Sequence, residues 1–206
     1  MTEVDPADAV AACRAAHDRI IATAAAVTDD GARAPSRLPG WTVGHVLTHV
    51  ARNADGHAHR LAGALRGKDL PRYPGGMPAR DREIEDGAGR PAVELAADVT
   101  ESARRLEEVW RCSVEAGWPN AHFLGDDRFT TSGSPLRRLR EVEVHHVDLG
   151  LGYEPEDWPD LYLDWELRHA LNRLPARLSG PDGRRLLAWL TGRAELPTGI
   201  SLDPWM

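Results

Sequence analysis

The sequence predicts a mainly α-helical protein, in which a bundle of four helices is followed by a small and mostly helical C-terminal appendage. Apolar residues recur at intervals of three and four along several stretches, which is the period of a helix with one buried face. Most of these stretches open on a capping residue or a proline and close on glycine, as helices do. The chain of 206 residues, 42% of them hydrophobic, is long enough to bury one substantial core.

The first helix is expected to start after Asp5, with Pro6 in the first helical position, where its missing N–H costs nothing. It should end near Gly31. His17 lies on the apolar face, which favours a core histidine bonded to another helix over a residue that lines a site. This face consists of Val10, Cys13, His17, Ile20, Ala24 and Val27.

The second helix is predicted from Thr42, an N-cap that follows an apolar tryptophan, to about Leu65. A polar line runs beside its apolar stripe and places His49 at the boundary of the core. Taken alone, a histidine at such a position is more often structural than a ligand. His57 and His59 are expected to be exposed. The apolar stripe consists of Val43, Val46, Leu47, Val50, Ala54, Ala58, Leu61 and Leu65.

Residues 67–90 contain many prolines and glycines, which predicts a loop instead of a continuous helix. One or two helical turns are expected within it, over residues 80–86. Long loops in compact domains often serve as lids or binding segments. Arg80 and Arg82 are therefore candidates to face an anionic substrate, and a solvated surface position is the alternative.

The third helix should open at Pro91 and stop at Gly117. A turn-rich connection follows, with a short hairpin expected around Asp126. The fourth helix is capped at Ser134 and ends near Gly150. It is apolar on several sides, which predicts a central place in the bundle.

Composition excludes several classes of partner. A net charge of −7 argues against a nucleic-acid partner. The chain begins without a signal-like region, and no run approaches the roughly 18 apolar residues of a membrane span, so we expect no membrane partner and a cytoplasmic location. Cys13 and Cys112 lack CxxC spacing, which predicts buried free thiols instead of a disulfide or a thiolate zinc site.

The residues with the clearest chemical meaning lie in the fourth helix. Glu141 and His145 are four residues apart, so on a helix they project within about 40° of each other, and Asp148 continues the same line. This is the geometry of metal ligands. A catalytic zinc usually takes three protein ligands and leaves one position open, so a third ligand must come from elsewhere. The best candidate is His49.

An ion pair is the alternative explanation for charge on this apolar helix. Ionised Glu141 would be costly to bury unless it is paired or bound to a cation. Glu143 and His146, each turned by about 100° from its neighbour, cannot share the face of the two ligand candidates. From spacing alone, a pair between Glu141 and a nearby arginine is at least as well supported as a metal site; these arginines are Arg137, Arg138 and Arg140.

Three segments, in this order, give the chain a family resemblance. They are Leu38–His49, Tyr73–Ala88 and Arg140–Asp148. Together they resemble the maleylpyruvate isomerase family of mycothiol-dependent enzymes, within the DinB-like metal-binding four-helix superfamily. The resemblance implies a DinB-like up-up-down-down four-helix bundle over residues 1–152, and it leaves 153–206 as a short C-terminal extension.

The resemblance also implies one bound divalent metal, usually zinc, held by the residues that match His49, Glu141 and His145. Asp148 matches a family position close to this site, where it would orient a ligand. The thiol mycothiol would bind at the open metal position, which lowers the pKa of the thiol so that a thiolate exists at neutral pH.

In the isomerase of this family, the thiolate adds to the activated double bond of maleylpyruvate, the resulting single bond rotates, and the thiol leaves to give fumarylpyruvate. Arginines would hold the substrate carboxylates. Arg80 is one candidate, and Arg193 matches a C-terminal family motif. The expected partners are a small-molecule substrate and a low-molecular-weight thiol, and the protein is expected to be a monomer or a homodimer.

Two alternatives accompany this interpretation. Family members often carry a larger C-terminal α/β domain, and the shorter region here favours transfer of the thiol to another electrophile as a second activity. The other alternative is a non-catalytic, metal-free helical binding module. Its partner surface would lie around Trp158, Trp189 and Trp205.

Overall fold

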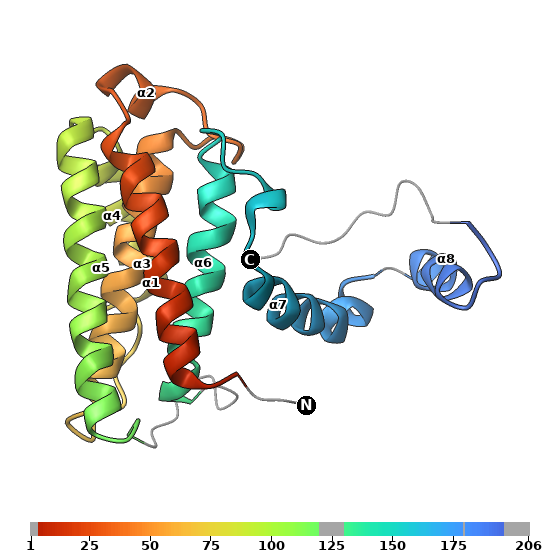
Figure 1. The fold of residues 1–206 in the computed structure, drawn as a ribbon. Helices are drawn as coiled ribbons and strands as arrows, with labels where there is room; N and C mark the ends of the chain where they lie inside the picture. Colours follow the sequence, from red (N-terminus) through yellow and green to blue (C-terminus); the bar gives the residue numbers. More distant parts are fainter. Residues whose placement is uncertain (1–3, 120–129, 179, 196–206) are drawn as a thin grey trace. The chain divides into compact units, whose positions relative to one another are not determined.

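The computed structural model describes residues 4–119, 130–178 and 180–195 (Figure 1). The chain divides into two compact units, Met1–Tyr162 and Leu163–Met206. Within the described ranges the regular structure is helical, apart from one isolated antiparallel bridge between Pro35 and Thr42. The mainly α fold is therefore confirmed, and the domain boundary expected after residue 152 stays a prediction.

Four long helices form a bundle in the first unit (Figure 1). They are α1 (Pro6–Ala25), α3 (Val43–Ala64), α5 (Ala92–Glu115) and α6 (Ser134–Asp148). Helix α3 packs against α5 and α1 against α6, while contacts of α1 with α5 and of α3 with α6 close a ring. Around this ring, in the order α1, α6, α3, α5, the helices run up, up, down and down.

The capping residues and the terminal glycine predicted from the sequence are found at the ends of several helices. The Asp5 side chain accepts a hydrogen bond from the backbone N–H of Ala7 at 2.7 Å, and the Thr42 hydroxyl accepts one from the backbone N–H of His45 at 3.4 Å. Gly117 follows α5 with a φ of 69°, a left-handed conformation that glycine adopts at little cost. Local capping therefore fixes where α1, α3 and α5 begin or end.

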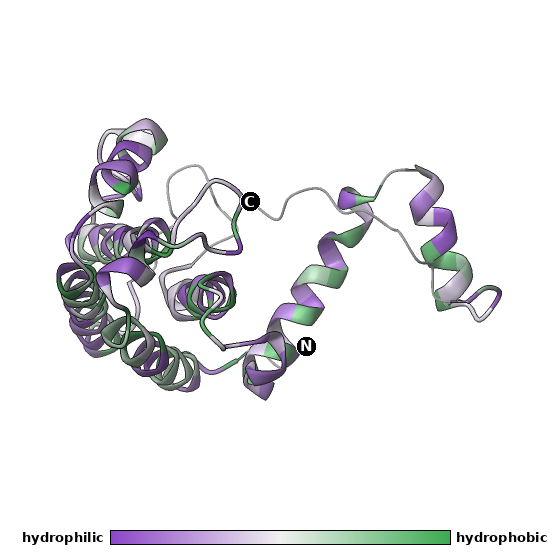
Figure 2. Cartoon of the chain, turned by 90° about the horizontal axis from the view of Figure 1, so that it is seen from above, coloured by the Kyte–Doolittle hydropathy of each residue, from purple (hydrophilic) through white to green (hydrophobic). Residues whose placement is uncertain are grey.

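The core lies between the four bundle helices. Figure 2 looks down the bundle and shows that each helix carries both apolar and polar residues, as an amphipathic helix does. His17 is 1% exposed, and its Nδ1 lies 2.8 Å from Oε1 of Glu107 on α5, so the prediction of a core histidine bonded to another helix is confirmed. Large buried side chains fill the centre, among them Ile20, Leu47, Leu61, Leu95, Leu106, Trp110 and Leu139.

Residues 67–90 differ from the expected loop, because α4 (Gly76–Ala88) is a helix of 13 residues that packs against α3. Gly75 precedes it with a φ of 81°. Pro78 falls in the first turn, where backbone N–H groups have no helical partner to lose. A Cβ atom at Gly44 would lie 2.2 Å from the carbonyl oxygen of Ala88, so glycine at this position allows α4 to approach α3.

Shorter elements complete the described chain. The first unit contains the short helix α2 (Asp29–Arg33) and the 3-10 turns Thr131–Gly133 and Pro155–Asp157. Helix α7 (Asp160–Arg173) leads into the second unit, which also contains α8 (Gly180–Leu190). The expected hairpin around Asp126 and the residue Trp205 lie outside the described residues. Among the described helices, none combines the length and apolarity needed to cross a membrane.

The prediction that His57 is exposed was wrong, because its side chain is 2% exposed. Its Nδ1 lies 3.0 Å from Oγ of Ser134, and its Nε2 lies 3.4 Å from a guanidinium nitrogen of Arg72. Both partners come from segments that cover α3, and helical spacing within α3 cannot reveal such a cover. His59 is half-buried.

Burial of His57 predicts a specific sensitivity to acid. Burial, reinforced by the charges of Arg72 and Arg138, lowers the pKa of His57 well below its usual 6.5. The folded protein keeps this ring neutral, whereas the unfolded chain binds a proton below pH 6.5, so stability is lost as pH falls. Between pH 7 and pH 5 we expect the free energy of unfolding, measured with urea, to fall by about 2 kcal/mol less in H57Q than in the wild type. Equal decreases in the two proteins would contradict this.

Candidate metal centre

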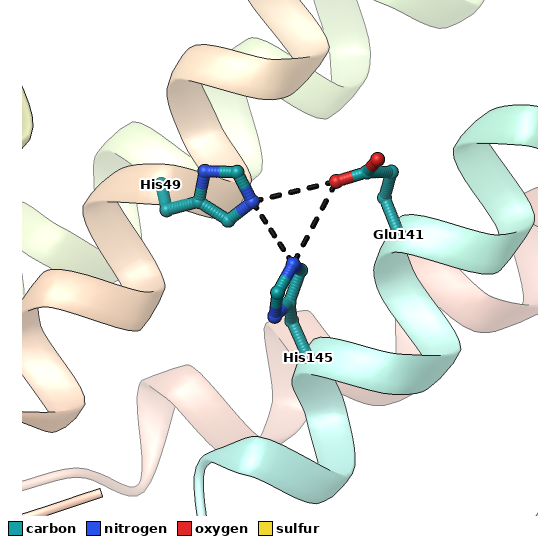
Figure 3. Close-up of side chains that lie close together, drawn as sticks. All are labelled: His49, Glu141 and His145. Carbon is teal, nitrogen blue, oxygen red and sulfur yellow. Dashed lines mark hydrogen bonds and ion pairs between the residues drawn. The ribbon is translucent and has the colours of Figure 1, made fainter. Parts of the chain in front are cut away.

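Helices α3 and α6 bring three predicted ligands together. His49 projects from α3, while Glu141 and His145 project from successive turns of α6 toward it (Figure 3). Both histidines are almost fully buried, with 2% and 1% of their surface exposed, and the Glu141 side chain is 18% exposed. In the described part of the chain, these three residues form the one cluster whose donor atoms could jointly hold a metal ion.

The spacing of the three donor atoms matches a single metal ion. Nε2 of His49 lies 3.0 Å from Nε2 of His145 and 3.4 Å from Oε2 of Glu141, and the remaining separation, between His145 and Glu141, is 3.7 Å. Nitrogen and oxygen ligands about 2.0–2.2 Å from a tetrahedral zinc lie about 3.3–3.6 Å apart. The three separations lie within about 0.3 Å of this range, so the donor set fits a zinc-like ion after small shifts of the side chains.

Asp148 supports the histidine of α6. Its Oδ2 lies 2.8 Å from Nδ1 of His145, one helical turn away. A carboxylate accepts only, so Nδ1 carries the hydrogen and the lone pair of Nε2 points at the cluster. Metal-binding histidines usually have such an outer acceptor, which fixes the ring and raises its basicity. The structure therefore places Asp148 where the resemblance implied it.

Charge in the cluster is distributed in a way that suits a cation. Burial opposes ionisation of Glu141, but the neighbouring imidazoles of His145 and His49 outweigh it and hold the pKa of this carboxyl well below its usual range. Burial lowers the pKa of His49 to about 4. Burial also disfavours charge on His145, yet Asp148 and Glu141 raise its pKa above the usual value. A neutral His49 and an anionic Glu141 are the forms that bind metal.

The alternative of an arginine ion pair is not observed. Within the described residues no arginine forms an ion pair with Glu141, whose carboxylate faces the two histidines. Arg138 is the nearest candidate in sequence on the same helix face. Its guanidinium instead donates to the carbonyl oxygen of Val50 at 2.9 Å and to Oδ1 of Asn53 at 3.0 Å. Acceptors on α3 thus hold the cation that spacing alone could have assigned to Glu141.

Glu143 and His146 lie on the other side of α6, as helical geometry predicted. Arg19 of α1 donates to Oε1 of Glu143 at 2.6 Å, and the Tyr153 hydroxyl donates to Oε2 at 2.5 Å. The His146 ring stacks on Tyr153, with centroids 3.9 Å apart, and its Nε2 lies 2.7 Å from Oγ1 of Thr23. These residues fasten α6 to α1 and to the segment that follows α6.

Arg80 reaches the cluster from α4. One guanidinium nitrogen lies 2.7 Å from Nδ1 of His49, and another forms an ion pair with Asp81 at 2.7 Å. The guanidinium carbon lies 6.0 Å from the centre of the Trp41 ring, which is itself 5.7 Å from the ring of His49. Trp41 was predicted only as an apolar residue before a helix cap. Its presence within the family segment was the one signal of a place at the site.

The other two predicted arginines are Arg82 and Arg193, and each is described within its own unit. Arg82 is an exposed residue of α4. Arg193 follows α8 in the second unit, where it is exposed and donates to the carbonyl oxygen of Thr191. Its assignment to substrate binding stays a prediction.

Comparison with known proteins identifies the bundle. The family described as the mycothiol maleylpyruvate isomerase N-terminal domain matches residues 13–150, which include all three residues of the cluster. The chain belongs to this family. The resemblance seen in the sequence is thereby confirmed, and membership in the mycothiol maleylpyruvate isomerase N-terminal domain family also confirms the expectation of an enzyme over a non-catalytic module.

Two solved structures are similar to this family member. One is a crystal structure of the mycothiol-dependent maleylpyruvate isomerase, and the other is a histidine-to-alanine mutant of the mycothiol-dependent maleylpyruvate isomerase. Each shares 26% sequence identity with the chain and a TM-score of 0.72, over 78% of this chain and 67% of the other. No curated protein matches the chain.

Proposed function

We propose that the protein is a metal-dependent enzyme that uses the thiol mycothiol to isomerise maleylpyruvate to fumarylpyruvate. The observation that carries this proposal is the triangle of His49, Glu141 and His145 in a chain whose family is described by that thiol and that substrate. The similar solved structures, which are those of a mycothiol-dependent maleylpyruvate isomerase, support it.

Zinc is the first candidate for the metal. Two imidazoles and one carboxylate form a frequent catalytic zinc set, in which the fourth position is left for water or substrate. When bound, such an ion lowers the pKa of a thiol at that position, so that a thiolate exists at neutral pH. In the chain itself, Asp148 orients His145, and Glu141 supplies the negative charge that offsets part of the charge of the ion.

The reaction conserves all atoms of the substrate. The thiolate adds to one carbon of the double bond, the remaining single bond rotates, and loss of the same thiol restores the double bond in the trans arrangement. Arg80 lies beside His49 and would hold a substrate carboxylate, for which a guanidinium offers two parallel donors. Arg193 is the second candidate for this task. Mycothiol must stay reduced to act, which favours a cytoplasmic enzyme, as a monomer or a homodimer.

Transfer of mycothiol to another electrophile is the second candidate function. It is favoured by the limits of the family match, which ends at residue 150. The second unit, with its helix α8, lies outside that match. In this activity the thiolate would add once and remain on the product.

The two activities differ in what happens to the thiol. Zinc-loaded protein should consume maleylpyruvate, followed by its absorbance, only when mycothiol is present, and the thiol should be recovered unchanged. A transferase would instead give a stable thiol adduct in mass spectrometry. The variant R104Q, altered at an exposed arginine of α5, serves as the control and should consume maleylpyruvate at the wild-type rate. The proposal would be refuted if the protein showed no thiol-dependent consumption of maleylpyruvate and also formed no thiol adduct.

A further inference from the structure

Arg80 occupies an unusual position for the neighbour of a metal ligand. The two histidines of the cluster differ in what holds their outer nitrogen. Nδ1 of His145 faces the Asp148 carboxylate at 2.8 Å, whereas Nδ1 of His49 faces the guanidinium of Arg80 at 2.7 Å. One histidine therefore has an anionic acceptor as its outer partner, and the other has a cationic donor.

Donor and acceptor chemistry assigns the hydrogen of His49. An arginine side chain only donates hydrogen bonds, so Nδ1 of His49 must accept. The neutral ring then carries its hydrogen on Nε2, the atom that points into the cluster. There it faces Oε2 of Glu141 at 3.4 Å and Nε2 of His145 at 3.0 Å. In this arrangement an N–H group fills the direction in which His49 would bind an ion.

A metal ion needs the opposite tautomer. To offer the Nε2 lone pair, the neutral ring must carry its hydrogen on Nδ1, as His145 does. An N–H group on Nδ1 would then confront an N–H group of Arg80 at 2.7 Å, donor against donor. The guanidinium charge would also lie close to the charge of the ion. His49 can therefore either accept the hydrogen bond from Arg80 or bind a metal ion, but it cannot do both at once.

We propose that Arg80 and a divalent cation compete for His49, so that metal binding releases the guanidinium to bind the carboxylate of an anionic substrate. This inference rests on the proposed function, because it takes the three-residue cluster to be the metal site. The surroundings of Arg80 leave room for its guanidinium to turn from His49 to a substrate carboxylate. The side chain is 11% exposed, its buried Nε has no hydrogen-bond partner, and the Trp41 ring lies beside it. Metal and anion should each strengthen binding of the other.

Metal affinity tests the competition directly. Chelator-treated wild-type protein and R80Q would be titrated with zinc against a chromophoric chelator. A glutamine amide can turn its oxygen toward an N–H on Nδ1, so R80Q accepts where arginine can only donate. Outer partners of metal ligands change affinity by roughly 10- to 100-fold, and we expect R80Q to bind zinc more tightly by about that factor. R82Q, the same change at an exposed position of α4, should bind like the wild type.

The outcomes separate this inference from the proposed function. Unchanged or weaker zinc binding in R80Q overturns the competition and leaves the metal site standing. A wild-type protein that binds no zinc overturns both. R80A replaces R80Q if the latter does not fold, and removal of the donor should tighten binding there as well.

Binding of maleate, a stable dicarboxylate probe, tests the release of the guanidinium. Zinc-loaded wild type should bind maleate more tightly than zinc-loaded R80Q, because only the wild type offers a freed guanidinium. The metal-free forms of the two proteins should bind it with equal weakness. Equal affinity of the two zinc-loaded proteins would overturn the assignment of a carboxylate to Arg80.

Discussion

Replacing His145 with alanine is expected to remove the bound metal. The substitution deletes one of three donor atoms and leaves the Asp148 carboxylate without its histidine. D148N, which keeps all three donors and weakens only the outer hydrogen bond, should lower the affinity by roughly 10- to 100-fold. H145A should lower it by more than D148N. Elemental analysis of protein purified without chelators, followed by zinc titration, gives both values.

The neighbouring histidine provides the matched control. H146A removes the same side chain one residue further along α6, but His146 faces Thr23 and Tyr153, away from the cluster. This variant should keep a stoichiometric metal ion. A metal content that falls equally in H145A and H146A would show that the loss reflects damage to the helix and not loss of a ligand.

Replacing Arg138 with alanine is expected to have the largest effect on stability. The side chain is fully buried, and its Nε lies 3.1 Å from Nε2 of His17. Two further bonds tie it to Val50 and Asn53 of α3, so R138A would leave acceptors on α1 and α3 unpaired. Breaking such a buried charged network costs about 3 kcal/mol or more, and urea denaturation at pH 7 should show this loss.

An exposed arginine supplies the comparison for R138A. Arg104 pairs with Glu101 at 2.8 Å, and its side chain is 67% exposed. Ion pairs on the surface contribute little to the stability of a protein, so R104A should change the free energy of unfolding by less than about 1 kcal/mol. A loss below 1 kcal/mol in R138A would mean that the buried network does not stabilise the bundle.

Local periodicity predicted the parts of the site that lie on one helix. Glu141 and His145 meet because four residues make about one helical turn, and Glu143 and His146 point elsewhere for the same reason. His49 was a weaker candidate because nothing in the spacing of α3 says which helix it faces. The packing of α3 against α6 decides this, and only the family resemblance pointed to it from the sequence.

Features that depend on contacts between segments were missed or predicted wrongly. His57 is buried by residues distant in sequence, which no pattern within its own helix reveals. The length of α4 was underestimated because Pro78 was counted as a helix breaker, although in the first turn it costs no hydrogen bond. Arg138 seemed a natural partner for Glu141, yet acceptors on α3 bind it instead.

The fastening of α6 on its far side has a consequence for how fast the site exchanges metal. Glu143 is held by Arg19 and Tyr153, and its backbone carbonyl accepts a hydrogen bond from Nε1 of Trp158 at 3.2 Å. The two donors on α6 are thus preorganised, and little ordering remains to be done there when an ion arrives. The rates of metal uptake and release should then be set by the movement of the Arg80 side chain on α4, without rearrangement of the bundle helices.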